Sequence, residues 1–149
     1  MSKCLLDTNI LLRLIQKQSA HHPLVAATLQ ILKSNNFSFI VVPQCLYEFH
    51  VVATRPQGVN GLGLPSVQMP SYIDDVLSMA ELIPDNLEVF ELWRELVFRH
   101  SISGKPSHDA RLVAAMKTHG ITHLLTFNVI DFARFWTDIT VIDPTSTIA

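Results

Sequence analysis

Short apolar runs alternate with longer segments of helical periodicity along almost the whole chain. The runs that we expect to form strands are residues 3–6, 37–42, 82–84, 123–126 and 140–142. The segments that we expect to form helices are residues 10–15, 24–33, 43–54, 66–79, 87–99 and 107–120. Strands that alternate with helices form a parallel sheet with both faces covered. The sequence therefore predicts an α/β fold with three layers, α/β/α, around a central parallel sheet of four or five short strands.

Polar residues and a proline indicate where several of these helices begin. Thr8 and Asn9 are expected to cap the first helix, because short polar side chains accept hydrogen bonds from free N–H groups. Asn86 is expected to cap the helix that ends near residue 99 in the same way. Pro23 and the two histidines before it are expected to break the chain ahead of the second helix. The first expected strand therefore runs almost directly into a helix, with Asp7 at the junction.

The chain has 149 residues, of which 48% are apolar and 16% are charged. This size and composition are typical of one folded domain, and no repeat or linker is visible, so we expect a single domain over residues 1–149. The formal net charge is −2, whereas proteins that bind nucleic acid without sequence preference are usually basic. Any nucleic-acid chemistry must therefore depend on a local site in which metal ions supply positive charge.

Cys4 and Cys45 are the only cysteines. Both have apolar neighbours and no CxxC pair is present, which predicts two reduced thiols in the core of a cytosolic protein and no zinc site. Asp7 and Asn9 interrupt any N-terminal apolar segment that could act as a signal peptide. No apolar run approaches the ~20 residues of a membrane span. We therefore expect a soluble, cytoplasmic protein without a membrane segment.

Three acidic residues occupy positions in apolar surroundings. Asp109 has apolar residues at i+3, i+4 and i+7, Glu48 has apolar neighbours on its own helix face, and Asp7 ends an apolar strand. Each position has a structural explanation of its own. Asp7 could be an N-cap, and Asp109 could be a first-turn residue favoured by the helix dipole. Glu48 could pair with Arg13 or Arg111.

Taken together, these acids map to one edge of the expected sheet. Asp7 ends the first strand, Glu48 lies in the helix after the second, and Asp109 lies at the start of a helix. Residues 128–131 follow the strand at 123–126, and ligands of open α/β sheets bind at the carboxyl ends of the strands. Three carboxylates in one place would repel one another, and a hard cation that takes oxygen ligands relieves that repulsion. The sequence therefore predicts a site for Mg²⁺ or Mn²⁺.

Four short motifs occur one after another along the chain. They are Leu5-Leu6-Asp7-Thr8-Asn9, Tyr47-Glu48-Phe49 after a strand and a proline, His108-Asp109-Ala110-Arg111-Leu112 at a helix start, and TFNVIDF over residues 126–132. In these motifs, which span nearly its whole length, the chain resembles the PIN-domain nucleases, in particular the VapC-type toxins of type II toxin–antitoxin systems. The resemblance implies a PIN-like fold, often dimeric, and Mg²⁺- or Mn²⁺-dependent endoribonuclease activity on an RNA substrate. It also implies a cognate antitoxin protein as a partner.

The resemblance also assigns roles to particular residues. The residues in the three core metal-binding places are Asp7, Glu48 and Asp109. Asn128 stands where many members carry a fourth Asp, and Asp131, three residues later, is the candidate to supply that carboxylate. The residues that would support these ligands and position the attacking water are Thr8, Asn9 and Thr126. The departure at Asn128 leaves open whether the site holds one metal ion or two.

Basic residues that flank the expected site in the chain are candidate RNA contacts. They are Arg13, Arg55, Lys105 and Arg111, and ion pairing or plain solvation is an equal alternative for each. The glycine-rich segment 58–63 is either a flap over substrate, part of a dimer surface or an ordinary connector. A GxSxG nucleophile motif and a GxGxxG phosphate loop are absent.

Two other hypotheses about the function stay open at this point. A catalytically weak PIN domain could act as a binding module for RNA or for a protein, and Asn128 is the main support for that hypothesis. Alternatively, an active nuclease could serve housekeeping RNA processing and not a toxin system.

Overall fold

A five-stranded, wholly parallel sheet forms the centre of the computed structural model, which describes residues 1–147. Its strand order is β3-β2-β1-β4-β5. The strands are β1 (Ser2–Leu6), β2 (Phe37–Val41), β3 (Glu81–Leu82), β4 (His123–Leu125) and β5 (Thr140–Ile142). The expected α/β fold with a central parallel sheet is confirmed, and the sheet has the larger of the two expected strand numbers.

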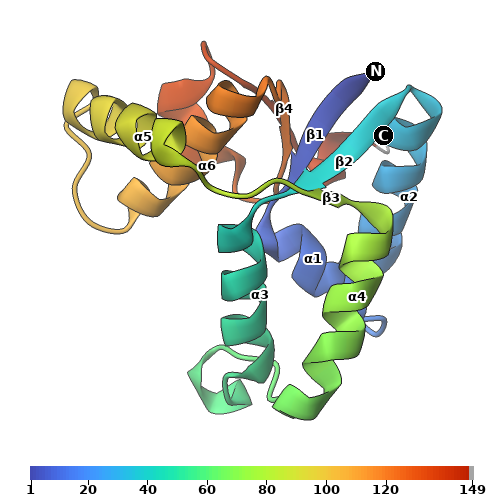
Figure 1. Ribbon diagram of the computed structural model, residues 1–149. Coiled ribbons are helices and arrows are strands. Elements are labelled where there is room, and N and C mark those ends of the chain that lie inside the picture. Colours follow the sequence, from blue (N-terminus) through green and yellow to red (C-terminus); the bar gives the residue numbers. More distant parts are fainter. Residues whose placement is uncertain (148–149) are drawn as a thin grey trace.

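Helices cover both faces of this sheet. They are α1 (Thr8–Ile15), α2 (His21–Ser34), α3 (Pro43–Thr54), α4 (Met69–Met79), α5 (Leu87–Arg99), α6 (Pro106–His119) and α7 (Pro144–Thr147). Short 3-10 helices span Gln57–Val59, Ser66–Gln68 and Val129–Phe135. In Figure 1, α5 and α6 lie on one side of the sheet, and α1, α2 and α4 lie on the other. The three-layer α/β/α arrangement follows from this.

The central strand β1 is buried on both of its faces. Cys4, Leu5 and Leu6 are 0% exposed. Leu5 pairs with Ile40 of β2 on one side and with Leu124 of β4 on the other. A strand covered by helices on both faces needs a continuous apolar run and not an alternating one. The apolar run that precedes Asp7 therefore places that residue at the carboxyl end of the middle strand.

Two expectations about helix starts are wrong. Pro23 does not break the chain, because α2 already begins at His21. Proline is tolerated in the first turn of a helix, where its missing N–H would have had no partner in any case. Thr8 and Asn9 are not the cap of α1, because Asp7 is the N-cap and its Oδ1 accepts a hydrogen bond from the N–H of Thr8 at 2.8 Å. The polar cap thus lies one residue earlier than expected.

Other boundaries agree with the sequence or shift slightly. Asn86 caps α5 as expected, with its Oδ1 accepting from the N–H of Val89 at 3.0 Å. The segment expected to be one helix from residue 66 begins as a 3-10 turn, and α4 itself begins at Met69. The third strand lies at Glu81–Leu82 and not at 82–84. Among residues 1–147, no helix combines the length and apolar character needed to cross a membrane.

Candidate active site

A cavity of about 980 Å³ opens at the carboxyl ends of the strands and brings four acidic side chains together. Asp7 reaches it from the end of β1, Glu48 from α3, Asp109 from the first turn of α6, and Asp131 from the 3-10 helix Val129–Phe135. We call it the acidic cavity. These residues are far apart in the sequence and meet because parallel strands end at the same edge of the sheet.

Asp7 is the most buried of these acids, at 7% exposed. Burial raises the pKa of its carboxyl group above the usual value, and the nearby charges of Glu48 and Asp131 raise the pKa further. Hydrogen bonds from the Thr126 hydroxyl and the Thr8 N–H act on the pKa in the opposite direction. Asp7 is thus the N-cap of α1, as its structural explanation proposed. Capping does not remove the repulsion from Glu48 and Asp131, which raises the pKa of its carboxyl group.

The Thr126 hydroxyl joins two segments of the site, residues 7–9 and residues 126–128. It donates to Oδ2 of Asp7 at 2.8 Å and accepts from Nδ2 of Asn9 and from the N–H of Asn128, both at 3.0 Å. Oδ1 of Asn9 accepts in turn from the N–H of Phe127 at 3.2 Å. A hydroxyl has one donor and two acceptor sites, so all of its hydrogen-bonding capacity is used. This network fixes the orientation of the Asp7 carboxylate.

Replacing Thr126 by valine should destabilise the protein by about 2–3 kcal/mol, because the change keeps the shape of a buried side chain but removes its hydrogen bonds. Thr126 is 0% exposed, so water cannot replace those bonds without rearrangement of the core. The free energy of unfolding from urea titrations measures the effect. Thr126→Ser keeps the hydroxyl and is the matched control. A Thr126→Val variant as stable as Thr126→Ser would contradict this role for the network.

Asp109 is half-buried and has a pKa raised to about 6. Burial is the largest cause, followed by the charges of Asp7, Asp131 and Glu48, while Lys105 lowers the pKa. A position in the first turn of a helix would by itself favour the charged form. The helix dipole is therefore not enough to offset the surrounding acids.

Glu48 is held by two neighbours. Its Oε2 accepts from the Thr8 hydroxyl at 3.0 Å, and its Oε1 accepts from Nε2 of Gln44 at 3.3 Å. Its suggested pairing with Arg13 or Arg111 is wrong. Arg13 donates to Oε1 of Gln16 at 2.6 Å, and Arg111 donates to Oδ2 of Asp85 at 3.0 Å.

Gln44 is a site residue that the sequence did not single out. It is 4% exposed, and its Nε2 also donates to the carbonyl of His108 at 3.0 Å. It therefore ties α3 to the first turn of α6, which carries Asp109. Its position four residues before Glu48 on the same helix face was the available signal.

Basic residues at the acidic cavity differ from the expected set. Arg55 and Lys105 line it, as does Arg134, which the sequence did not single out. Arg13 and Arg111 are absent from its lining.

The loop after α3 turns back on the helix, and Gly61 lies so close to the Arg55 carbonyl that an added Cβ would come within 1.8 Å of that oxygen. This close approach requires glycine and accompanies the hydrogen bond from Arg55 to the Asn60 carbonyl at 3.1 Å.

The donor set of the acidic cavity fits a hard divalent cation. None of the ion pairs formed within residues 1–147 involves its four acids. Carboxylate oxygens are the ligands that Mg²⁺ and Mn²⁺ take, and a cation would relieve the repulsion that raises the pKa of Asp7 and Asp109. Within residues 1–147, no three His, Cys, Asp or Glu side chains lie close enough together to hold a metal ion as they stand. Coordination would therefore require the carboxylates to draw closer together.

The expected reduced core thiols agree with the structure, in which Cys4 and Cys45 are free and buried. Burial raises the pKa of the Cys45 thiol, and the charges of Asp7 and Glu48 raise it further. A neutral thiol is a poor metal ligand. Cys45 is therefore a packing residue beside the acids.

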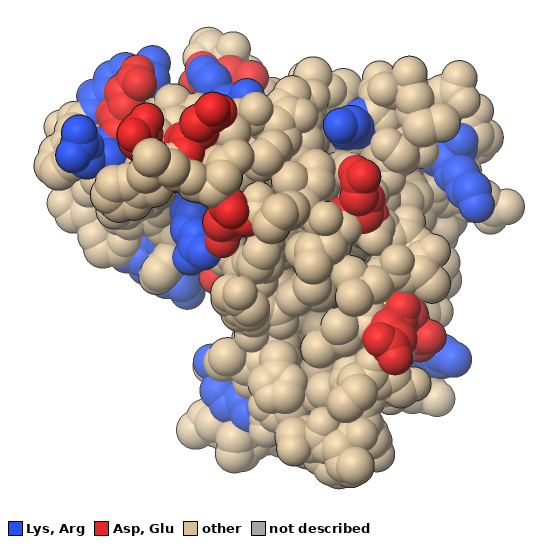
Figure 2. Space-filling model, viewed as in Figure 1, with Lys and Arg blue, Asp and Glu red and all other residues tan. Residues whose placement is uncertain are grey.

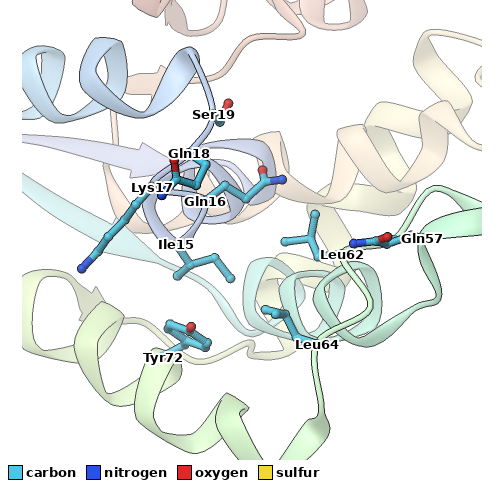
Figure 3. A pocket seen from close by; sticks show the side chains of 10 residues that line it. Ile15, Gln16, Lys17, Gln18, Ser19, Gln57, Leu62, Leu64 and Tyr72 are labelled. Atoms are coloured by element: carbon cyan, nitrogen blue, oxygen red, sulfur yellow. The ribbon is translucent and has the colours of Figure 1, made fainter.

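A separate hollow between α1, the loop after α3 and α4 has a different character. Figure 3 shows Ile15, Leu62, Leu64 and Tyr72 around it, with Gln16 and Lys17 nearby. Of residues 1–147, no Asp or Glu contributes to its lining. This hollow does not fit a divalent cation, so the acidic cavity is the candidate active site.

No family model and no curated protein matches the chain by sequence. Solved structures do match by fold. VapBC2 from Rickettsia felis, bound to a DNA fragment from its promoter, has a TM-score of 0.69 at 19% identity over 95% of this chain and 98% of the other. VapBC-1 from nontypeable Haemophilus influenzae has a TM-score of 0.67 at 16% identity over 97% and 99%. VapC20 from Mycobacterium tuberculosis, a sarcin–ricin loop cleaving toxin, has a TM-score of 0.65 at 17% identity over 88% and 94%.

The fold and the site define an α/β protein with an acidic centre at the carboxyl edge of a parallel sheet. More specifically, the chain has the PIN-like fold of the VapC proteins. The fold expected from the four sequence motifs is thus confirmed.

Proposed function

We propose that this protein is a Mg²⁺- or Mn²⁺-dependent endoribonuclease that hydrolyses RNA phosphodiester bonds. The observation that carries the proposal is the convergence of four carboxylates, from four separate elements, in one cavity where none has an ion-pair partner within residues 1–147. The VapC-like fold supports the proposal, as does the RNA-cleaving activity of VapC20, one of the proteins that share it.

In the proposed site, Asp7, Glu48 and Asp109 hold the divalent ion, and Asp131 supplies a fourth carboxylate from the edge of the cavity. When bound, such an ion lowers the pKa of water and stabilises the charge that develops on the phosphate oxygens. The Thr126 network and Thr8 keep the carboxylates oriented. The fourth expected acid position carries Asn128, which also lines the acidic cavity. We therefore place the fourth ligand at Asp131.

The residues that we propose to contact the RNA phosphates are those that line the acidic cavity: Arg55, Lys105 and Arg134. A chain with a formal charge of −2 cannot attract RNA by its overall charge, so local contacts and the bound ion must do so. We do not assign this role to Arg13 or Arg111, because neither lines the acidic cavity.

We further propose that the protein acts in the cytoplasm as the toxin of a toxin–antitoxin pair. The VapBC complexes among the structural neighbours support an antitoxin partner. A homodimer is supported by exposed apolar side chains outside the acidic cavity, such as Tyr47 on α3 at 65%. Figure 2 also shows that charged side chains gather over the α5 end, while the middle of the same face is largely uncharged.

A cleavage assay on a mixed RNA pool tests the proposed activity. With Mg²⁺ or Mn²⁺ present the RNA should be shortened, and excess EDTA should abolish the cleavage because the acidic cavity then lacks its cation. Gel electrophoresis of the RNA and a parallel mobility-shift assay measure cleavage and binding separately. A protein that shifts RNA but never shortens it, with either ion, would instead be a binding module.

A further inference from the structure

A third and smaller pocket lies on the other side of the first turn of α6. Its volume is about 370 Å³, which is within the range of small-ligand sites. The residues on which the inference depends are Phe90 and Trp93 of α5, His108 and Arg111 of α6, and Asp85. We call it the aromatic pocket. No step of the proposed cleavage uses it.

Two aromatic rings form one wall of the aromatic pocket. Phe90 and Trp93 have ring centroids 6.0 Å apart, with their planes inclined by 32°. The Trp93 ring is held in place because its Nε1 donates to the carbonyl of Ser107 at 2.8 Å. Phe90, in contrast, is 52% exposed. A fixed indole beside an open phenyl ring offers a flat surface on which another planar ring can stack.

The aromatic pocket adjoins the acidic cavity directly. His108 lines both, and Asp109 follows it in the chain. The turn between the two spaces is held from both sides, by Gln44 at the carbonyl of His108 and by Trp93 at the carbonyl of Ser107. A flexible chain with a phosphate in the acidic cavity could therefore place its neighbouring group in the aromatic pocket.

The rim of the aromatic pocket is charged and polar. Arg111 donates to Oδ2 of Asp85 at 3.0 Å, and their side chains are 38% and 36% exposed. A guanidinium has five N–H donors, so this bond leaves others for a ligand. Aromatic rings beside an arginine are how proteins commonly hold unpaired bases of RNA, by stacking and by hydrogen bonds to base edges. A purely apolar ligand would make no use of this rim.

We propose that the aromatic pocket binds an unpaired nucleobase of the RNA, next to the phosphate held in the acidic cavity. Phe90 and Trp93 stack on the base, and Arg111 contacts the edge of the base. This inference rests on the proposed function for its substrate class. It adds that the substrate must be single-stranded where it is cut, because a paired base cannot enter the pocket.

Binding of a short single-stranded RNA to the Asp7→Asn variant tests the inference without cleavage. Trp93 and Trp136 are the only tryptophans, so a Trp136→Phe background leaves Trp93 as the single tryptophan. We expect RNA to quench its fluorescence and Phe90→Ala to weaken binding by about tenfold, the usual effect of losing one stacked base. In a mobility-shift assay, which does not depend on tryptophan fluorescence, Phe90→Trp should bind as well as the parent, and Phe90→Leu should not, because leucine keeps apolar area but lacks a flat ring.

Phe98→Ala is the matched control, since Phe98 lies on the same helix, is 75% exposed and does not line the pocket. Phe90→Ala binding equal to that of Phe98→Ala, or unchanged Trp93 fluorescence, would overturn the inference. If Phe90→Ala dissociated a dimer in sedimentation while RNA binding stayed unchanged, the pocket would be a protein interface and the inference would also fail. Failure here with intact RNA cleavage leaves the proposed function standing. Loss of cleavage with Phe90-dependent binding leaves this inference standing alone.

Discussion

Replacing Asp7 by asparagine is expected to reduce RNA cleavage by about a thousandfold or more, because the change removes a charge that would hold the catalytic ion. The fold should survive. Asparagine is as good an N-cap as aspartate, so its Oδ1 can still accept from the N–H of Thr8. Only the bond from the Thr126 hydroxyl to Oδ2 is lost, and a burial-raised pKa shows that the charge itself is unfavourable there. The two changes oppose each other, so we expect a stability within about 1 kcal/mol of the parent.

Cleavage kinetics and urea unfolding of the same preparations separate a catalytic effect from a folding effect. Asp75→Asn is the matched control, because it removes an exposed acid on α4 that does not line the acidic cavity. Full cleavage by Asp7→Asn in both Mg²⁺ and Mn²⁺ would refute the assigned role of Asp7.

Without divalent ions, the protein should lose stability as the pH rises from about 4 to 6. The pKa of Asp109 is 3.8 in an unfolded reference and about 6 in the folded protein. A carboxyl group with a raised folded-state pKa binds more protons in the folded state, so its stabilising contribution is present at low pH and is lost as the pH passes through the folded-state value. Asp7, whose pKa is also raised, adds to this loss.

Mn²⁺ should reverse this trend above pH 6, because carboxylates bind it only when ionised. An ion at a hundred times its Kd adds about 2.7 kcal/mol to the free energy of unfolding. Thermal unfolding at pH 5 and pH 8, with EDTA or Mn²⁺, measures both effects. The matched comparison is Asp109→Asn against the parent under the same conditions, and this variant should flatten the profile and lose most of the Mn²⁺ gain. An unchanged Mn²⁺ response in Asp109→Asn would show that the ion binds elsewhere.

The layers of the fold could be predicted from the sequence because each buried strand is a short apolar run and each connection is long enough for a helix. The meeting of Asp7, Glu48 and Asp109 could be predicted too, since two of them follow strands in a parallel sheet. The exact cap of α1 could not, because Asp7, Thr8 and Asn9 are all residues that cap helices well. Only the backbone shows which of them lies outside the first turn.

The supporting residues were harder to predict, for geometric reasons. Arg111 is close to Asp109 in the chain, yet two positions along a helix amount to about 200° of rotation, which directs Arg111 to Asp85. Arg134 depends on the 3-10 helix Val129–Phe135, for which the sequence had no periodic signal. Gln44 resembles any polar residue near a helix start until α6 is placed beside it.

The hydrogen bonds of Asp7 have a consequence for the thermodynamics of ion capture. One of its oxygens is held by the N–H of Thr8 and the other by the Thr126 hydroxyl, so the carboxylate is preorganised. The side chains of Asp109 and Asp131 have no such hydrogen bond to the rest of residues 1–147. The rotamer entropy lost when a cation enters must therefore come mainly from these two acids, and a mutation that restricts their rotamers would tighten ion binding without touching a ligand atom.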